Sequence, residues 1–246
     1  MAVDTGSTVD GAPAHTVDAV ARGMTGKRGA LFLDLDGTLA DSGAGITTAV
    51  DRVLASLGTS PLTEEEKRFI IGPAFQHTMP VLLRARGLDE NLTDGLITEY
   101  RRIYSAEHLP RTPRIEGIGE VIEELAGMFH LSVVTAKPVN QAAVAVRAIG
   151  MEHMMEIVIG PQPDAPTPKA RLLETAIAHV RATRDAALAH DACWMIGDRH
   201  HDIDAAVEVG TGSIGVMWGY GDEEELRGAG ATHIAHVPAD LLSLLA

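Results

Sequence analysis

Short apolar runs alternate with helix-like patterns along the chain from Ala30 onward. Their apolar residues are continuous rather than alternating with polar ones, which is typical of strands in a parallel sheet covered on both faces. The runs are ALFLDL (30–35), LSVVT (131–135), EIVIG (156–160), CWMIGD (193–198), SIGVMW (213–218) and, more weakly, THIA (232–235). We therefore predict an α/β fold with a central parallel sheet.

Helical periodicity fills the intervals between these runs, and several of the predicted helices end at a glycine, as helices often do. The segments are 117–127, 139–150, 168–180, 202–210, 223–230 and 238–246. Strand and helix patterns thus follow one another as in a βαβ array.

One interval is too long for a crossover helix. About seventy residues without a strong strand pattern separate the first run from LSVVT, far more than such a connection needs. Helical patterns occupy 45–58, 63–72, 75–87 and 93–109, and Thr63 and Glu66 have capping-box spacing. We predict a core at 27–43 and 113–246, an all-helical cap at 44–112, and a disordered tail at 1–26.

Composition narrows the function classes. The 246 residues are 46% hydrophobic and carry 20 Lys plus Arg against 34 Asp plus Glu, a formal charge of -14. This charge argues against a dedicated binder of nucleic acid polymers or anionic membranes. No apolar run approaches the ~20 residues of a membrane helix. Cys193 has no partner for a disulfide, so we expect a cytoplasmic protein.

Two carboxylates follow the first apolar run. Asp34 and Asp36 are two residues apart, so on a continuing strand they would share one face and disfavour each other's ionisation. A positive group is therefore expected nearby. A simple turn at Asp-Gly-Thr would account for Asp36 and Thr38 but leaves Asp34 unexplained.

Other polar residues follow later strands at the same end. Thr135 follows the second run, Asp198 ends CWMIGD, and Lys169 begins a helix after EIVIG. The carboxyl ends of parallel strands meet at one edge of a sheet, where ligands bind. We expect these side chains to converge on a single site.

In these residues the chain resembles the haloacid dehalogenase superfamily, phosphatase branch, from Ala30 to the C-terminus. DLDGTLADS matches the first motif of that family, Thr135 the second, Lys169 the third, and GDRHHD (197–202) the fourth. The resemblance implies a Rossmann-like core with an inserted helical cap. It is nearest to the phosphoglycolate phosphatase and 5'-nucleotidase-like group.

The resemblance also implies roles. Asp34 is expected to be the nucleophile and Asp36 the general acid and base. Asp34, Asp198 and the backbone carbonyl of Asp36 are expected to bind Mg²⁺, which an all-oxygen site favours. Lys169 would offset negative charge, while Asp202 would orient Lys169 or a metal-bound water. Residues expected to contact the phosphate are Gly37, Thr38, Thr135, Ala136 and Lys169.

Some further residues have two interpretations. His200 and His201 suggest zinc, but no other His or Cys stands at ligand spacing, so Mg²⁺ is preferred. Lys137 lies two residues after Thr135 and is expected either to support the site or to be a charge at the surface. Gly72 and Pro73 are expected to shape a cap loop near the active site.

Three more features have two interpretations each. Arg84 and Arg86 could meet a substrate carboxylate, although their place before Gly87 in a last helical turn is the simpler explanation. Trp218 and Tyr220 could stack on a base or simply pack. Met24 could be the true start, which leaves open whether residues 1–23 belong to the native protein.

We therefore expect a Mg²⁺-dependent phosphatase that hydrolyses a small phosphorylated metabolite through an aspartyl-phosphate, similar to phosphoglycolate phosphatases. The alternatives are a phosphomutase of the same superfamily, a 5'-nucleotidase, and a binding protein without turnover. The last is disfavoured because no reacting residue is missing. Asp36 disfavours the dehalogenase and phosphonate-cleaving branches, which lack an acid at that position. The physiological substrate and the oligomeric state cannot be derived from these residues.

Overall fold

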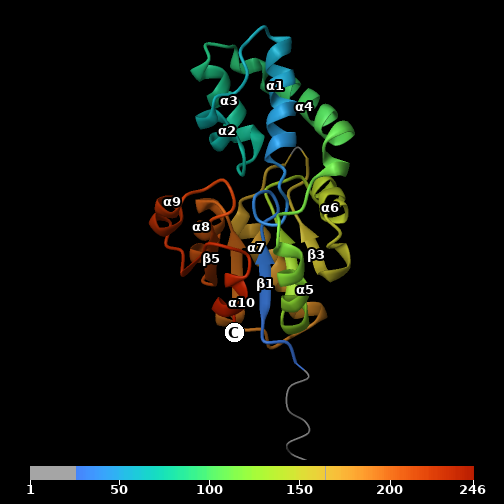
Figure 1. Ribbon diagram of the computed structural model, residues 1–246, viewed down its shortest axis with the longest axis vertical. Helices are drawn as coiled ribbons and strands as arrows, with labels where there is room; N and C mark the ends of the chain where they lie inside the picture. Colours follow the sequence, from blue (N-terminus) through green and yellow to red (C-terminus); the bar gives the residue numbers. More distant parts are fainter. Residues whose placement is uncertain (1–25, 164) are drawn as a thin grey trace, which may run out of the picture.

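The computed structural model describes residues 26–163 and 165–246 of the chain (Figure 1). The disordered tail predicted for residues 1–26 lies, apart from Gly26, outside these described residues. Within the same two ranges, no helix is both long and apolar enough to cross a lipid bilayer.

A parallel sheet of six strands forms the centre of the described molecule, in the order β3-β2-β1-β4-β5-β6. The strands are β1 Ala30–Leu33, β2 His130–Val134, β3 Met155–Ile159, β4 Cys193–Gly197, β5 Gly212–Val216 and β6 His233–Ala235. Each overlaps one of the apolar runs, so the predicted parallel sheet is confirmed. The strand order reverses between β1 and β4, and this is where open α/β sheets bind ligands.

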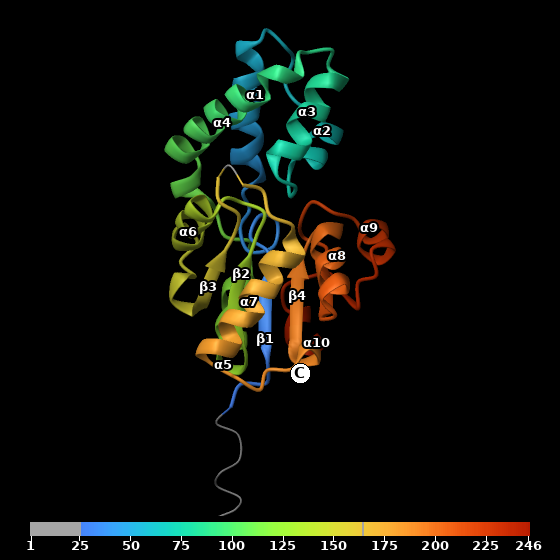
Figure 2. The same cartoon turned by 180° about the vertical axis from the view of Figure 1, so that it is seen from behind.

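Helices cover both faces of the sheet, and the residues of β1 alternate between the two resulting cores. Leu31 and Leu33 belong to one core, with the apolar side of α5, whereas Phe32 belongs to the other, with α7 and α8. The core helices are α5 Ile118–Met128, α6 Val139–Ala148, α7 Lys169–Thr183, α8 His200–Val209, α9 Glu223–Gly228 and α10 Asp240–Leu244. Figure 1 shows α5 and α10 in front of the sheet, and Figure 2 shows α7 from the opposite side.

Four helices that come between β1 and β2 in sequence form a separate group beyond the carboxyl ends of the strands (Figures 1 and 2). They are α1 Gly43–Ser56, α2 Glu64–Ile70, α3 Phe75–Ala85 and α4 Thr93–Glu107. Leu54 of α1 and Tyr100 of α4 are among the residues that this group buries. The predicted helical insertion is present, and we keep residues 44–112 as its proposed limits and the name cap for it.

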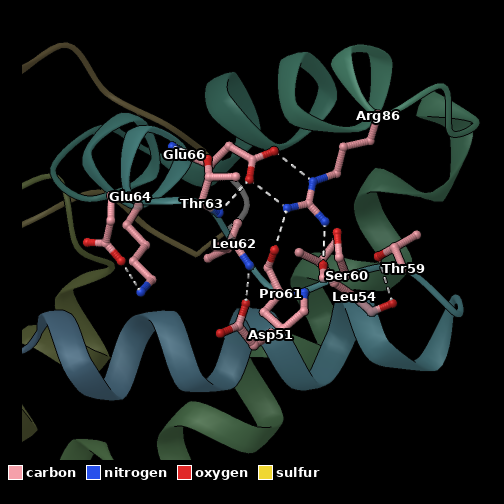
Figure 3. A network of polar contacts seen from close by, with 11 residues as sticks. Asp51, Leu54, Thr59, Ser60, Pro61, Leu62, Thr63, Glu64, Glu66 and Arg86 are labelled. Atoms are coloured by element: carbon pink, nitrogen blue, oxygen red, sulfur yellow. Dashed lines mark hydrogen bonds and ion pairs between the residues drawn. The ribbon is translucent and has the colours of Figure 1, made fainter.

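A polar network joins α2 to α3 within the cap (Figure 3). Thr63 and Glu66 exchange hydrogen bonds between side chain and backbone, so the predicted capping box is present. The Arg86 guanidinium donates to both Glu66 oxygens, at 2.7 and 2.6 Å, and to two carbonyls of the preceding loop. Arg84 pairs with Glu90 at the surface. Both arginines therefore have partners within the cap, which favours the structural interpretation over a substrate carboxylate.

Candidate active site

The residues expected to carry chemistry meet at the carboxyl edge of the sheet. Asp34 directly follows β1, Asp198 directly follows β4, and Asp202 lies in the first turn of α8. All three side chains are buried, and each offers an oxygen that lies within 4.8 Å of the ones offered by the other two. Three carboxylates are thus gathered where water is largely excluded.

One ammonium group lies beside this carboxylate cluster. Lys169 Nζ is 2.8 Å from Asp34 Oδ1 and also forms an ion pair with Asp202. Burial alone would lower the pKa of Lys169, but the Asp202 and Asp34 carboxylates outweigh it and the pKa lies above its ordinary value. Lys169 therefore stays a cation next to the proposed nucleophile, and Asp202 makes the contact that its expected role requires.

Asp198 is neutralised less well. Its carboxylate accepts a hydrogen bond from the Tyr220 backbone N–H at 2.8 Å and one from the Thr38 hydroxyl at 3.4 Å. Burial, together with the charges of Asp34 and Asp202, raises the pKa of Asp198 well above its usual range. Burial also raises the pKa of Asp34 to about 6, although Lys169 opposes the shift. The cluster carries more negative charge than its surroundings compensate.

This donor set fits a divalent cation that prefers oxygen. Three buried carboxylates face one lysine, and an added positive charge would favour the ionised forms of Asp34 and Asp198. Oxygen-only ligands suit Mg²⁺ better than zinc. His200 and His201 gather with Asp204, whose Oδ2 lies 2.9 Å from His200 Nδ1 at the surface. The carboxylate of this group, Asp204, is exposed, whereas the three carboxylates of the cluster at Asp34 are buried. We therefore still predict Mg²⁺ at the buried cluster.

The turn after β1 is shaped around Asp198. Gly37 has φ +86°, and a Cβ at this position would collide with the Asp198 carboxylate, so only glycine fits. Trp218 Nε1 donates to the Thr38 carbonyl at 3.1 Å. The Tyr220 hydroxyl accepts from a backbone N–H at the start of α1. Both aromatic residues hold this turn in place, which favours packing over stacking on a base.

Lys137 is not a surface charge, contrary to one of the two interpretations from sequence. Its side chain is only 5% exposed, and Nζ donates to both carboxylate oxygens of Asp36, at 2.9 and 2.8 Å. It also lies 4.7 Å from the ring centre of Tyr104 on α4. Burial would lower the pKa of Lys137, but the Asp36 charge raises it above its ordinary value. The signal in the sequence was its position at the same strand end as Thr135.

Thr135 lies buried after β2, and its Oγ1 accepts the backbone N–H of Lys137 at 3.2 Å. Ala136, the next residue, lines a cavity of about 330 Å³ that lies between cap and core. Asp34, Lys169 and Asp202 line one part of this cavity, and the cap contributes Gly72, Pro73, Ala74 and His77. The remaining lining residues are Pro161, Pro166, Thr167, Pro168, Arg199 and His201. A substrate in this cavity would contact the carboxylate cluster.

The other walls of the cavity offer little charge. Prolines contribute apolar surface, and burial together with His200 lowers the pKa of His201 to about 4, so its imidazole is neutral at pH 7. Arg199 is paired with Glu225 at 2.9 Å. Apart from the carboxylate cluster and Lys169, the cavity therefore suits an uncharged group.

Comparison with known proteins places this geometry in context. Residues 31–216 match the family described as haloacid dehalogenase-like hydrolase. A 5'-nucleotidase of Pseudomonas aeruginosa is 33% identical over 216 residues, covering 87% of this chain and 92% of the relative. The tyrosine-protein kinase PtkA of Mycobacterium tuberculosis is 31% identical over 209 residues, covering 84% and 68%.

Solved structures agree with the family match. A haloacid dehalogenase-like hydrolase from Streptococcus pneumoniae superimposes with a TM-score of 0.78 at 27% identity, covering 89% of this chain and 98% of that one. Structures described as phosphoglycolate phosphatases reach TM-scores of 0.72 to 0.74 at 20% to 24% identity, which shows a shared fold alone.

Proposed function

The chain belongs to the haloacid dehalogenase-like hydrolase family and is a phosphatase, and from this premise we propose that it hydrolyses small phosphomonoesters with Mg²⁺ through an aspartyl-phosphate on Asp34. The observation that carries the proposal is the buried carboxylate cluster with Lys169 at the cavity between cap and core. The net negative charge of the chain argues against nucleic acid polymers and anionic membranes as partners, and the free, buried Cys193 supports an enzyme of the cytoplasm. We propose a small phosphorylated metabolite as its substrate.

In the first step, Asp34 attacks phosphorus, the ester oxygen leaves, and Asp36 supplies the proton that this oxygen takes. In the second step, Asp36 removes a proton from water, whose oxygen attacks the same phosphorus. Inorganic phosphate departs and the Asp34 carboxylate is restored. With a pKa of about 6, Asp34 is largely ionised at pH 7, as a nucleophile must be.

Other residues of the chain would stabilise the transferring group. The Thr135 oxygen accepts the Lys137 N–H, so its own hydrogen is available to a phosphoryl oxygen. Lys169 would reduce repulsion between Asp34 and the phosphate. Mg²⁺, held by Asp34, Asp198 and the Asp36 carbonyl, supplies further positive charge when bound. Gly37, Thr38 and Ala136 are proposed to complete the phosphate contacts.

The charge of the cavity walls bears on which leaving group the substrate carries. Phosphoglycolate carries a carboxylate, which needs a cation, yet Lys169 and Arg199 on the cavity wall are already paired. A nucleoside is uncharged and suits apolar walls. Together with the 33% identity to a 5'-nucleotidase, this favours 5'-nucleotides over phosphoglycolate.

A second candidate differs only in what accepts the phosphoryl group. A phosphomutase would pass it to a sugar hydroxyl. The 31% identity to a tyrosine-protein kinase adds transfer to a tyrosine hydroxyl. Incubation with labelled phosphate donors distinguishes these activities, because only a phosphatase returns the label mainly as inorganic phosphate.

The decisive experiment measures phosphate release from p-nitrophenyl phosphate, 2-phosphoglycolate and a series of 5'-nucleotides, with Mg²⁺ or with EDTA. We expect Mg²⁺-dependent release, and Asp34→Asn should abolish it because a neutral amide cannot act as nucleophile. Circular dichroism should show an unchanged fold. Turnover like that of the wild type in Asp34→Asn would refute the mechanism, and turnover in EDTA would refute the metal requirement.

A further inference from the structure

Arg199 connects the metal-binding edge of the core to the cap. It follows Asp198, and its Nη1 donates to the carbonyls of Arg68 at 2.9 Å and Ile71 at 2.5 Å, at the end of α2. Its Nε donates to Glu225 of the core at 2.9 Å. The side chain is only 12% exposed, and the bonds to Glu225 and to the Ile71 carbonyl are partly buried, whereas the bond to the Arg68 carbonyl lies at the surface.

These contacts are of a strong type. The last carbonyls of a helix lack partners within the helix, and a guanidinium satisfies them through charge-assisted hydrogen bonds. The backbone of Arg199 is itself fixed, because its N–H donates to Asp202 Oδ2 at 3.1 Å. Asp202 is also the ion-pair partner of Lys169. Through Arg199, the cap is therefore attached to the loop between β4 and α8, and Asp202 of the active site holds the backbone of that loop.

The cap segment that Arg199 holds forms part of the cavity wall. Gly72 directly follows Ile71, has φ +108°, and lines the cavity together with Pro73 and Asp34. A Cβ on Gly72 would lie 3.1 Å from Arg199 Cγ, so the arginine stem packs closely against this turn. Moving Arg199 would therefore move the cavity wall.

We propose that Arg199 is a positioning residue that holds the cap closed over Asp34. Without it, the closed state would be a smaller fraction of the free protein, and apparent substrate affinity falls in proportion to that fraction. Once substrate has closed the cap, the reacting groups are unchanged, so KM rises while kcat is nearly constant. The kinetic part of this inference rests on the proposed phosphatase function, whereas the conformational part does not.

The conformational part is tested by measuring a distance between cap and core. Spin labels are placed at Val81 on α3 and Val207 on α8, both exposed, with buried Cys193 replaced by Ala. Double electron–electron resonance should give one narrow distance distribution for the labelled protein with Arg199 intact. Arg199→Ala should add a population at longer distance. Arg227→Ala is the matched control, because Arg227 forms an ion pair with Glu223 on its own helix. Identical distributions with and without Arg199 would refute the proposal.

The kinetic part uses p-nitrophenyl phosphate at saturating Mg²⁺. We expect Arg199→Ala to raise KM about tenfold, equivalent to about 1.4 kcal/mol, and to change kcat less than about twofold. Arg199→Lys should restore part of the loss. If Arg199→Ala does not fold, Glu225→Gln weakens the same link and should show the same pattern more mildly.

Other outcomes are equally informative. A lower kcat and a higher Mg²⁺ requirement, with KM and distances unchanged, would mean that Arg199 acts only on Asp198, and would overturn the proposal. If no variant or wild-type protein hydrolyses any ester, the proposed function fails, and the distance measurement still decides the role of Arg199.

Discussion

Asp34 and Asp36 stand two residues apart, and each has its own ammonium partner. Lys169 pairs with Asp34 at 2.8 Å, and Lys137 pairs with Asp36 at 2.9 and 2.8 Å. Two neighbouring carboxylates can therefore keep different tasks, because separate cations stabilise them and different surroundings hold them. Lys137 also fixes the orientation of Asp36 through both oxygens, which suits a base that takes a proton from water.

Replacing Asp36 by Asn should separate the two chemical steps. Attack by Asp34 can survive with p-nitrophenyl phosphate, whose leaving group needs no proton, but water would lack its base. We expect rapid-quench labelling to show a slowly decaying acyl phosphate. An alkyl phosphate should lose at least tenfold more of its first-step rate than p-nitrophenyl phosphate, within the 10²–10⁴-fold range of acid-base catalysis.

The comparison of leaving groups is the internal control for Asp36→Asn. Equal losses for aryl and alkyl esters, with phosphoenzyme decaying as in the wild type, would show that Asp36 carries no proton. Lys137→Met offers a second check, because it removes the partner of Asp36 without touching the carboxylate itself. It should lower the rate for both esters by less than Asp36→Asn does.

Residues at strand ends could be predicted as a site, whereas contacts between cap and core could not. Asp34, Asp198 and Lys169 were placed by their positions after apolar runs and by motif. The burial of Lys137 depends on Tyr104, which reaches it from a helix some thirty positions away in sequence, and no local pattern encodes that meeting. The same holds for Arg199 and its carbonyl partners on α2.

At the scale of elements, periodicity located each helix and the first residue of α3, α4, α6 and α9, but not the start of α8. The pattern suggested a helix from Asp202, yet α8 begins at His200. The reason is that the Asp202 carboxylate accepts the Arg199 backbone N–H, which satisfies a donor at the helix start and extends the helix toward Asp198. The capping box at Thr63, in contrast, was legible because both partners are close in sequence.

Arg84 in the last turn of α3 and Arg86 directly after this helix should contribute differently to stability. Arg86→Ala removes a largely buried ion pair with Glu66 and hydrogen bonds to two loop carbonyls. We therefore expect the free energy of unfolding to fall by about 2 kcal/mol. Arg84→Ala removes an exposed pair with Glu90 and should cost about 0–1 kcal/mol. Urea unfolding measures both. Similar losses, or a selective loss of activity in Arg86→Ala, would contradict the structural role.

The Arg86 effect should also depend on pH. Hydrogen bonding to Arg86 lowers the pKa of Glu66 from 4.5 to about 2. A carboxylate whose folded pKa is depressed stabilises the fold fully above its unfolded pKa, and this contribution disappears as pH falls from about 4.5 to about 2. The difference between wild type and Arg86→Ala should therefore shrink over that window.

At the scale of the whole molecule, the sheet order brings residues distant in sequence to one edge. β1 lies between β2 and β4, so Asp34 and Asp198 meet although more than 160 positions separate them. The apolar runs predicted a parallel sheet but not this order, because every run is compatible with several neighbours. The order, with the cap above that edge, concentrates buried negative charge at one point of the fold.

Because this buried negative charge should destabilise the metal-free protein, we expect metal binding to raise its free energy of unfolding. Folding raises the pKa of Asp34 from 3.8 to about 6 and that of Asp198 in the same direction. For Asp34, the native state binds more protons than the unfolded state between these two values, so its contribution to metal-free stability falls as pH rises from about 4 to 6. The raised pKa of Asp198 acts in the same direction. Mg²⁺ should reverse this, by about 2.7 kcal/mol at a hundredfold excess over Kd.

Asp198→Asn tests this account, because it removes one buried charge and one proposed ligand together. In EDTA at pH 7 we expect its Tm to exceed that of the wild type, by about 2–4 °C for each kcal/mol recovered. The difference should be smaller at pH 5, where the wild-type carboxyls are more protonated. Added Mg²⁺ should raise the Tm of the wild type but barely that of the variant, while the exposed Asp204→Asn behaves as the wild type does. Equal Mg²⁺ stabilisation of the wild type and Asp198→Asn would remove Asp198 from the metal site. A lower metal-free Tm in the variant would show that the hydrogen bonds of Asp198 to Thr38 and Tyr220 outweigh the cost of its buried charge.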